Sequence, residues 1–196
     1  HASGNTVEVD RAVLALDLAL AGVDVAVVSG GDAGVFGMAA AVFEAAETDP
    51  GRYAAVPVHV VPGITAAHAA SAVAGAVLGA DHALISLSDR LKPWDVVLQR
   101  LSAAVRADLA VALYNPRSRS RPEQLGLALD AVRALAPPER IVVVARHVGR
   151  PDEHVQVTTL GEIDPQTVDM GCLVVIGASR TRRTATGRVW TPRSVD

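Results

Sequence analysis

The sequence predicts an α/β protein made of two domains, the first with a parallel sheet and the second with a mixed sheet. Short runs of β-branched residues are each followed by a glycine-containing turn and then by a helical pattern, and this unit occurs twice before residue 80. Beyond residue 80 further strand-like runs alternate with helices, and one run alternates apolar and polar residues. We therefore expect an N-terminal domain over 1–80 and a C-terminal domain over 81–196.

The first domain opens with a helical pattern over 6–20, which Gly22 ends. A β-branched run at 23–28 predicts a buried parallel strand, and a helix is expected at 35–46. The unit then repeats, with a strand at 56–61 and a helix that starts at Ala66 and runs to Leu78. A doubly wound sheet normally opens with a strand, so we expect this domain to lack its first strand, with sequence missing before the first helix.

The second domain has the segments of an α/β fold with a mixed sheet. The predicted strands and helices are 83–87, 94–106, 109–113, 122–135, 141–145 and 173–176. The alternation over 154–160 predicts an edge or antiparallel strand, and the tail from 180 to 196 is expected to be extended.

Composition limits the partners. Of 196 residues half are hydrophobic, and 18 Lys and Arg against 21 Asp and Glu give a net charge of −3, which favours neither nucleic acid nor an anionic membrane. Apolar runs are too short for a spanning helix. The same charge balance favours a small-molecule partner. The single cysteine, Cys172, cannot form an internal disulfide, which predicts a cytoplasmic protein.

Two turns at predicted strand ends are candidate ligand loops. Residues 29–34 (SGGDAG) can bring backbone N–H groups to a ligand, or form a tight turn in which Asp32 caps the next helix. Likewise Pro62-Gly63 can contact a ligand or simply form a rigid turn, with Thr65 capping the helix from Ala66. The residues alone leave both alternatives open.

A basic loop and scattered histidines complete the candidates. Arg117, Arg119 and Arg121 alternate along one loop, which is either a solvated loop or a clamp for a polycarboxylate. His147 and His154 have no zinc-like spacing and no nearby cysteine, so no metal site is expected.

Six segments in order resemble the tetrapyrrole methyltransferase family. They are SGGDAGVFGMA, VVPGITA, ISLSDRLKPWDVV, ALYNPRSRSR, VDMGCLVVIGASRTRR and WTPR. The resemblance covers nearly the whole chain, and the SLSDRLKPW and YNPRS segments are similar to the branch that methylates C(17) of precorrin-3B. Two positions depart from the family pattern, since Ala33 replaces the usual Pro and Phe36 the usual Tyr.

The resemblance implies a fold, a cofactor and a reaction. The fold would hold S-adenosylmethionine in a cleft between two α/β domains of a homodimeric enzyme, and the reaction would be C(17) methylation of precorrin-3B with ring contraction to precorrin-4 in cobalamin biosynthesis. The donor-binding positions that it implies are Gly30, Gly31, Asp32, Val35, Thr65, Ala66, Tyr114, Asn115, Val148, Gly171 and Cys172. The basic loop would bind the substrate carboxylates. Asp32 is the leading candidate for proton transfer, and Asp89 and His147 are weaker ones.

Three alternatives remain open. The target could be another carbon of a related precorrin, or a cobalt-precorrin. The chain could also be a binding module without catalysis. A dinucleotide-dependent oxidoreductase is disfavoured because the sequence has no G-x-G-x-x-G fingerprint followed by an acidic residue.

Overall fold

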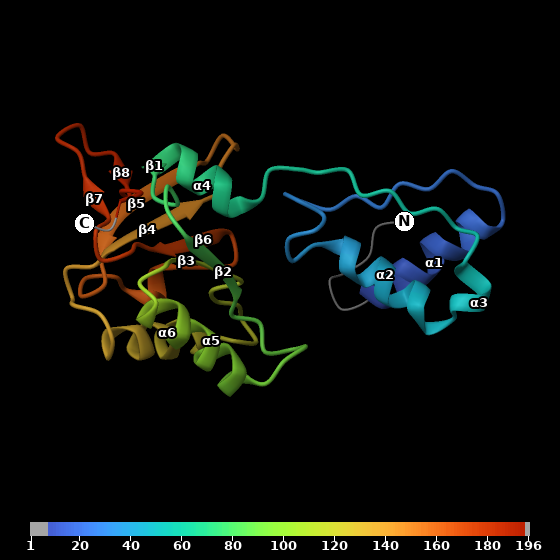
Figure 1. Ribbon diagram of the computed structural model, residues 1–196, viewed down its shortest axis with the longest axis horizontal. Helices are drawn as coiled ribbons and strands as arrows, with labels where there is room; N and C mark the ends of the chain where they lie inside the picture. The colour runs from blue at the N-terminus through green and yellow to red at the C-terminus, as the bar shows by residue number, and fades with distance from the viewer. Residues whose placement is uncertain (1–7, 195–196) are drawn as a thin grey trace. The chain divides into compact units, whose positions relative to one another are not determined.

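The computed structural model describes residues 8–194, which divide after Thr65 into two compact units. The sequence predicted a domain boundary near residue 80 instead. The difference lies in α4 (Ala66–Ala74), whose contacts in the structure are with strands of the second unit, as Figure 1 shows. Small residues on this helix, Ala67 and Ala70, are fully buried, which lets its backbone approach the sheet closely.

The first unit is held together by helices. They are α1 (Glu8–Leu20), α2 (Met38–Thr48) and the single-turn α3 (Pro50–Tyr53). Ala12 and Leu16 on α1 pack against Val42 on α2 and the ring of Tyr53 in one apolar cluster. The Tyr53 hydroxyl donates to Asp17 at 2.8 Å, which satisfies its polar end.

The two segments predicted as strands in this unit, 23–28 and 56–61, are extended but form no β-ladder within the described residues. The prediction of paired strands is therefore wrong for both. The physical reason is that a ladder needs a neighbouring strand whose N–H and C=O groups are in register, and among residues 8–194 no strand pairs with either segment. The β-branched residues still favour the extended conformation.

The second unit contains a five-stranded mixed sheet, as predicted. Its order is β2-β3-β6-β4-β5, with β2 parallel to β3 and the other three pairings antiparallel. The strands are β2 (His82–Ser86), β3 (Ala110–Tyr114), β4 (Ile141–Arg146), β5 (His154–Thr159) and β6 (Cys172–Ile176). The alternating segment, β5, forms one edge of the sheet, which confirms the prediction made from its pattern.

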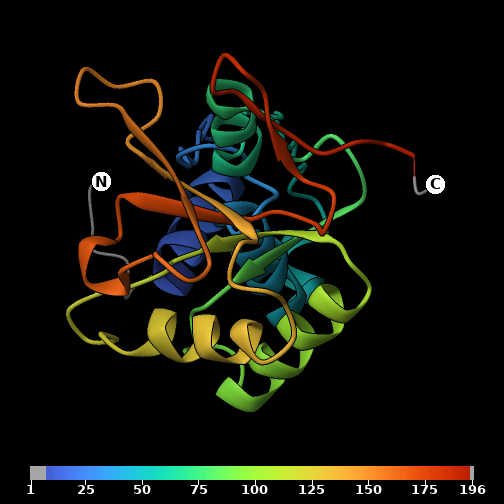
Figure 2. The ribbon, with the colours of Figure 1, turned by 90° about the vertical axis from the view of Figure 1, so that its left-hand side faces the viewer.

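Layers cover both faces of this sheet, as Figures 1 and 2 show. The amphipathic helices α5 (Trp94–Arg106) and α6 (Gln124–Arg133) bury leucines and valines against one face. On the other face lie α4 and a small sheet, β1-β8-β7, formed by β1 (Gly75–Ala76), β7 (Arg182–Arg183) and β8 (Val189–Trp190). A short 3₁₀ helix, η1 (Pro165–Thr167), precedes β6. The tail is extended, as predicted, but part of it pairs with β1.

Candidate functional site

The candidate site of the second unit lies at one end of its five-stranded sheet, where several strands finish. Strands β2 and β3 are parallel, and β3 and β4 both pair antiparallel with β6. The carboxyl ends of β2, β3 and β4 therefore all lie at this end of the sheet. Strand β6 begins there, with Cys172 opposite Arg146. The loops that follow three strands therefore meet the turn that precedes a fourth, which is where open α/β sheets place ligands.

Asn115 follows β3 in a left-handed backbone conformation, with φ of 52°. Its amide nitrogen donates to the Ser86 hydroxyl at 2.9 Å, which ties the ends of β2 and β3 together. The preceding residue, Tyr114, accepts a hydrogen bond from the backbone N–H of Ala67 at 2.9 Å. That donor is one of the N–H groups that the first turn of a helix leaves unpaired. Three residues predicted to contact the methyl donor, Ala66, Tyr114 and Asn115, are thus neighbours.

His147 follows β4, also with a positive φ of 48°. Its Nδ1 lies 2.5 Å from Asp152 Oδ2, and this hydrogen bond is the main cause that holds the pKa of Asp152 below its ordinary value. The backbone N–H of His147 donates to the Gly171 carbonyl at 3.1 Å. The His147 ring lies so close to Gly171 that a β-carbon at that position would collide with Nε2. Gly171 is therefore required by packing within the protein.

Asp169 organises the turn before β6. Its Oδ1 accepts from the Gly171 N–H at 2.9 Å and lies 3.4 Å from the Cys172 sulfur, and its Oδ2 pairs with Arg146 at 3.0 Å. Burial raises the pKa of the Cys172 thiol, which argues against a thiolate nucleophile. Sequence reasoning missed Asp169 and Ser86. The available signal for Asp169 was an Asp two residues before a Gly, a pattern typical of side chains that accept from a turn N–H.

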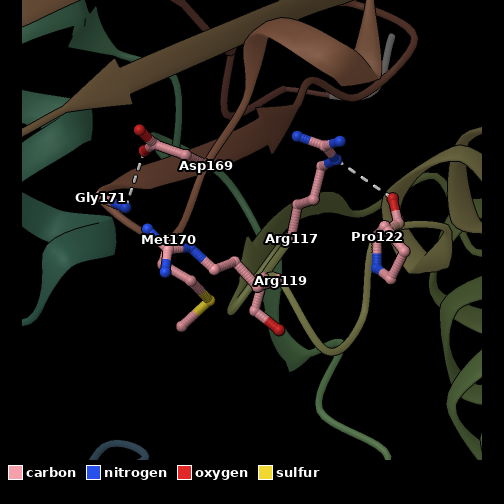
Figure 3. Close-up of a pocket in the computed structure, with 7 residues that line it drawn as sticks. Arg117, Arg119, Pro122, Asp169, Met170 and Gly171 are labelled. Carbon is pink, nitrogen blue, oxygen red and sulfur yellow. Dashed lines mark hydrogen bonds between the residues drawn. The ribbon is translucent and has the colours of Figure 1, made fainter.

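A cavity of about 530 Å³ lies beside this turn and the basic loop (Figure 3). Its lining residues are Arg117, Ser118, Arg119, Pro122, Asp169, Met170 and Gly171. Arg117 is held in place, because Nε donates to the Pro122 carbonyl at 3.2 Å and Nη2 to Gln166 at 2.7 Å. Within residues 8–194, Arg119 makes no hydrogen bond or ion pair, so its guanidinium is available to an anion.

Arg121 is buried, unlike the other two arginines of the loop. Only 8% of it is exposed, and its Nη1 donates to the carbonyls of Leu87 at 3.2 Å and Asn115 at 3.5 Å. Its Nε has no partner among the described atoms. These contacts give Arg121 a local task, which is to hold the loops after β2 and β3 together. Of the three arginines predicted to bind substrate, Arg117 and Arg119 line the cavity and Arg121 does not.

The predicted donor-binding residues of the first unit gather at two touching turns. Gly31 has a φ of 76°, which favours glycine, and a β-carbon on Gly63 would collide with the Gly31 carbonyl oxygen. Asp32 accepts from the Gly34 N–H at 2.8 Å through Oδ1 and from the Gly63 N–H at 2.9 Å through Oδ2. Gly30, Val35 and the buried Thr65 belong to the same two turns or follow them directly.

The alternative in which Asp32 caps the next helix is wrong. Helix α2 begins at Met38, and the Met38 N–H donates to the Ser29 hydroxyl at 3.3 Å. Asp32 is too early in the chain to reach that N–H, and its two oxygens bridge the turns instead. The remaining predicted positions lie in the second unit, at the same end of the five-stranded sheet as Asn115. Val148 follows β4, and Cys172 begins β6.

Two classes of site are not found among residues 8–194. No group of three or more His, Cys, Asp or Glu side chains there could hold a metal ion, and no helix there is long and apolar enough to cross a membrane. The second unit offers a fixed amide at Asn115 and guanidinium groups beside a cavity.

Comparison with known proteins assigns this chain and its α/β fold to a family. Residues 2–164 match the Tetrapyrrole (Corrin/Porphyrin) Methylases, and the chain belongs to that family. The resemblance inferred from the six segments is thereby confirmed.

Three named proteins are similar to the chain over most of its length. The chain is 49% identical over 181 residues to a precorrin-3B C(17)-methyltransferase of Sinorhizobium sp., covering 92% of this chain and 71% of the relative. It is 41% identical over 186 residues to a probable cobalt-factor III C(17)-methyltransferase of Salmonella typhimurium, covering 95% and 76%. A crystal structure of the methyltransferase CobJ superposes with a TM-score of 0.94 at 45% identity, covering 98% of this chain and 80% of that one.

Proposed function

We propose that this protein transfers a methyl group from S-adenosylmethionine to C(17) of precorrin-3B, with ring contraction to precorrin-4, in cobalamin biosynthesis. The observation that carries the proposal is the 49% identity over 92% of the chain to a precorrin-3B C(17)-methyltransferase. The high structural similarity to the methyltransferase CobJ supports it. The cavity beside Arg117 and Arg119 has the charge that a polycarboxylate macrocycle requires.

The residues present fit the methyl donor by their chemistry. A nucleoside needs fixed polar groups and an apolar wall, and the five-stranded sheet offers Val148 after β4 and, after β3, the Asn115 amide that the Ser86 hydroxyl holds in place. When bound, S-adenosylmethionine would supply an already activated methyl group, so the protein's contribution is chiefly to position the substrate carbon.

Calorimetric titration with S-adenosylhomocysteine, the reaction product, tests the donor site without the unstable substrate. We expect saturable binding of one equivalent per chain. The variant Asn115→Ala loses the amide that joins β2 and β3, and it should weaken binding. The control variant Gln99→Ala changes an exposed side chain of α5 and should leave binding unchanged. Absence of binding by the folded wild-type chain would contradict the proposed donor.

Arg117 and Arg119 are proposed to bind the acetate and propionate groups of the macrocycle. Arg119→Lys keeps the charge but loses the planar pair of donors, so the Michaelis constant for the macrocycle should rise while affinity for S-adenosylhomocysteine stays unchanged. An unchanged Michaelis constant in both Arg117→Lys and Arg119→Lys would contradict this role.

Asp32 is proposed as a proton-transfer group for the ring contraction. The two hydrogen bonds that its carboxylate accepts from Gly34 and Gly63 give it a competing structural task. Asp32→Asn keeps the size of the side chain but removes the acid–base function, and a proton-transfer role predicts a loss of turnover of about a hundredfold or more. Normal turnover with a lowered melting temperature would leave only the structural role.

A cobalt-containing substrate is the second candidate, because the Salmonella relative is named for cobalt-factor III. Turnover of precorrin-3B and cobalt-factor III by the same preparation, followed by absorption and mass spectrometry, separates the two. We also propose a homodimer in the cytoplasm, which sedimentation analysis and cell fractionation test directly.

A further inference from the structure

Arg121 carries a buried positive charge that has no anionic partner in the described part of the chain. Only 8% of the residue is exposed, and its Nη1 donates to two neutral carbonyls, those of Leu87 and Asn115. No carboxylate among residues 8–194 forms an ion pair with it. Burying a guanidinium is costly unless an anion compensates its charge. The charge of Arg121 therefore indicates a place for a negatively charged ligand.

One edge of the Arg121 guanidinium is almost free of acceptors. Nε has no hydrogen-bond partner among the described atoms, and Nη2 has the Met170 sulfur at 3.9 Å, which is a weak acceptor. Nε and Nη2 point to the same side of the guanidinium plane, so together they can donate two parallel hydrogen bonds to one carboxylate. Two backbone hydrogen bonds with Ser118, both at 3.1 Å, fix Arg121 in its loop, so this edge is held in place before a ligand binds.

Met170 connects this edge with the cavity beside the basic loop. Its sulfur lies against Nη2, and the same residue belongs to the lining of the cavity shown in Figure 3. The side chain is 46% exposed and unbranched, so it can rotate away without disturbing the core. A carboxylate would accept at about 2.7–2.9 Å and form a bond roughly twice as strong as one between neutral groups. The sulfur therefore lies where a ligand carboxylate would bind better.

The charges around the cavity also favour an anion. Arg117 and Arg119 contribute two further positive charges to the lining. The carboxylate in the lining, Asp169, is paired with Arg146 at 3.0 Å, so its negative charge is compensated. An incoming carboxylate would thus meet a net positive surface on its way to Arg121.

We propose that the Nε–Nη2 edge of Arg121 binds a carboxylate of a ligand in this cavity, in place of the Met170 sulfur. The proposal rests on the function proposed above, whose two ligands both carry carboxylates. The methyl donor has one, on its amino-acid part, and the macrocycle has several, in its acetate and propionate groups. The chemistry that Arg121 recognises is the same in both, and binding measurements separate the two sources.

A change in the ligand combined with a change in the protein tests the donor carboxylate. The probes are S-adenosylhomocysteine and S-adenosyl-3-thiopropylamine, which keeps the ammonium group and lacks the carboxylate. If Arg121 binds this carboxylate, calorimetry on the wild-type chain should show at least about tenfold weaker binding of the second probe. In Arg121→Met both probes should bind with about equal affinity. Arg121→Lys keeps the charge but loses the paired donors, so it should retain only part of the difference, and it carries the test where Arg121→Met is too unstable to purify.

The macrocycle carboxylates are tested with uroporphyrin, a stable polycarboxylate tetrapyrrole, in a fluorescence titration. If Arg121 binds one of them, Arg121→Met should weaken uroporphyrin binding at least about tenfold, while both nucleoside probes bind as in the wild type. Met170→Leu removes the sulfur at similar size and should weaken neither ligand. The control Arg100→Met removes an exposed arginine of α5 and should change neither measurement.

Two results would overturn the proposal. The first is an unchanged ratio of the two nucleoside probes together with unchanged uroporphyrin binding in Arg121→Met. The second is equal weakening of both nucleoside probes, with or without loss of uroporphyrin binding, because Arg121 would then only hold the loops after β2 and β3 together. A folded wild-type chain that bound no S-adenosylhomocysteine would instead contradict the donor proposed above, and the uroporphyrin titration would still decide the role of Arg121.

Discussion

Gly171→Ala tests the packing between the turn before β6 and the loop after β4. A β-carbon on Gly171 would meet His147 Nε2 and would lie 2.7 Å from Cδ2 and 3.2 Å from Asp169 Oδ1. The imidazole cannot yield without weakening its hydrogen bond to Asp152 at 2.5 Å. Overpacking of this kind costs about 1–3 kcal/mol. For a chain of this size about 2 kcal/mol corresponds to a melting temperature lower by roughly 4–8 °C.

The assay is thermal unfolding followed by circular dichroism, with a matched control. Gly126→Ala lies in α6 with open space around the added methyl, so it should raise stability by about 0.5–1 kcal/mol through helix propensity. Combining Gly171→Ala with His147→Ala should cost less than the two separate losses added together, because the shortened side chain makes room. An unchanged melting temperature for Gly171→Ala, or strict additivity in the double variant, would refute the packing argument.

Three further predictions use the same logic. Gly63→Ala should destabilise the protein by about 1–3 kcal/mol, because the added methyl meets backbone that cannot rotate away, whereas Gly30→Ala has open space; equal melting temperatures for the two would contradict this. Cys172 should react with iodoacetamide at pH 8 about tenfold or more slowly than a free thiol, because burial raises its pKa, and a normal rate would contradict its burial. Because His147 lowers the folded pKa of Asp152, the stability advantage over Asp152→Asn should be full above about pH 4 and disappear as the pH falls further; an advantage that grows in acid would contradict the sign.

Several features could be predicted from the sequence alone because they depend on local patterns. The helix over 94–106 was predicted with the bounds that α5 has, because its apolar residues recur at helical spacing. The alternation in β5 marked an edge strand, since one of its faces is exposed. Family membership followed from six ordered segments, because short motifs and their order are carried directly by the sequence.

Tertiary structure decided what depends on partners distant in the chain. Arg119 and Arg121 look equivalent in sequence, but only Arg121 folds inward onto the carbonyls of Leu87 and Asn115, which its spacing does not encode. The sequence left open whether Asp32 caps a helix or belongs to a ligand loop, and only the fold shows that its Oδ2 accepts from the Gly63 N–H, 31 positions away. The runs at 23–28 and 56–61 favour an extended backbone, but a strand becomes a sheet only when a neighbour supplies matching donors and acceptors, and that condition is set by the fold.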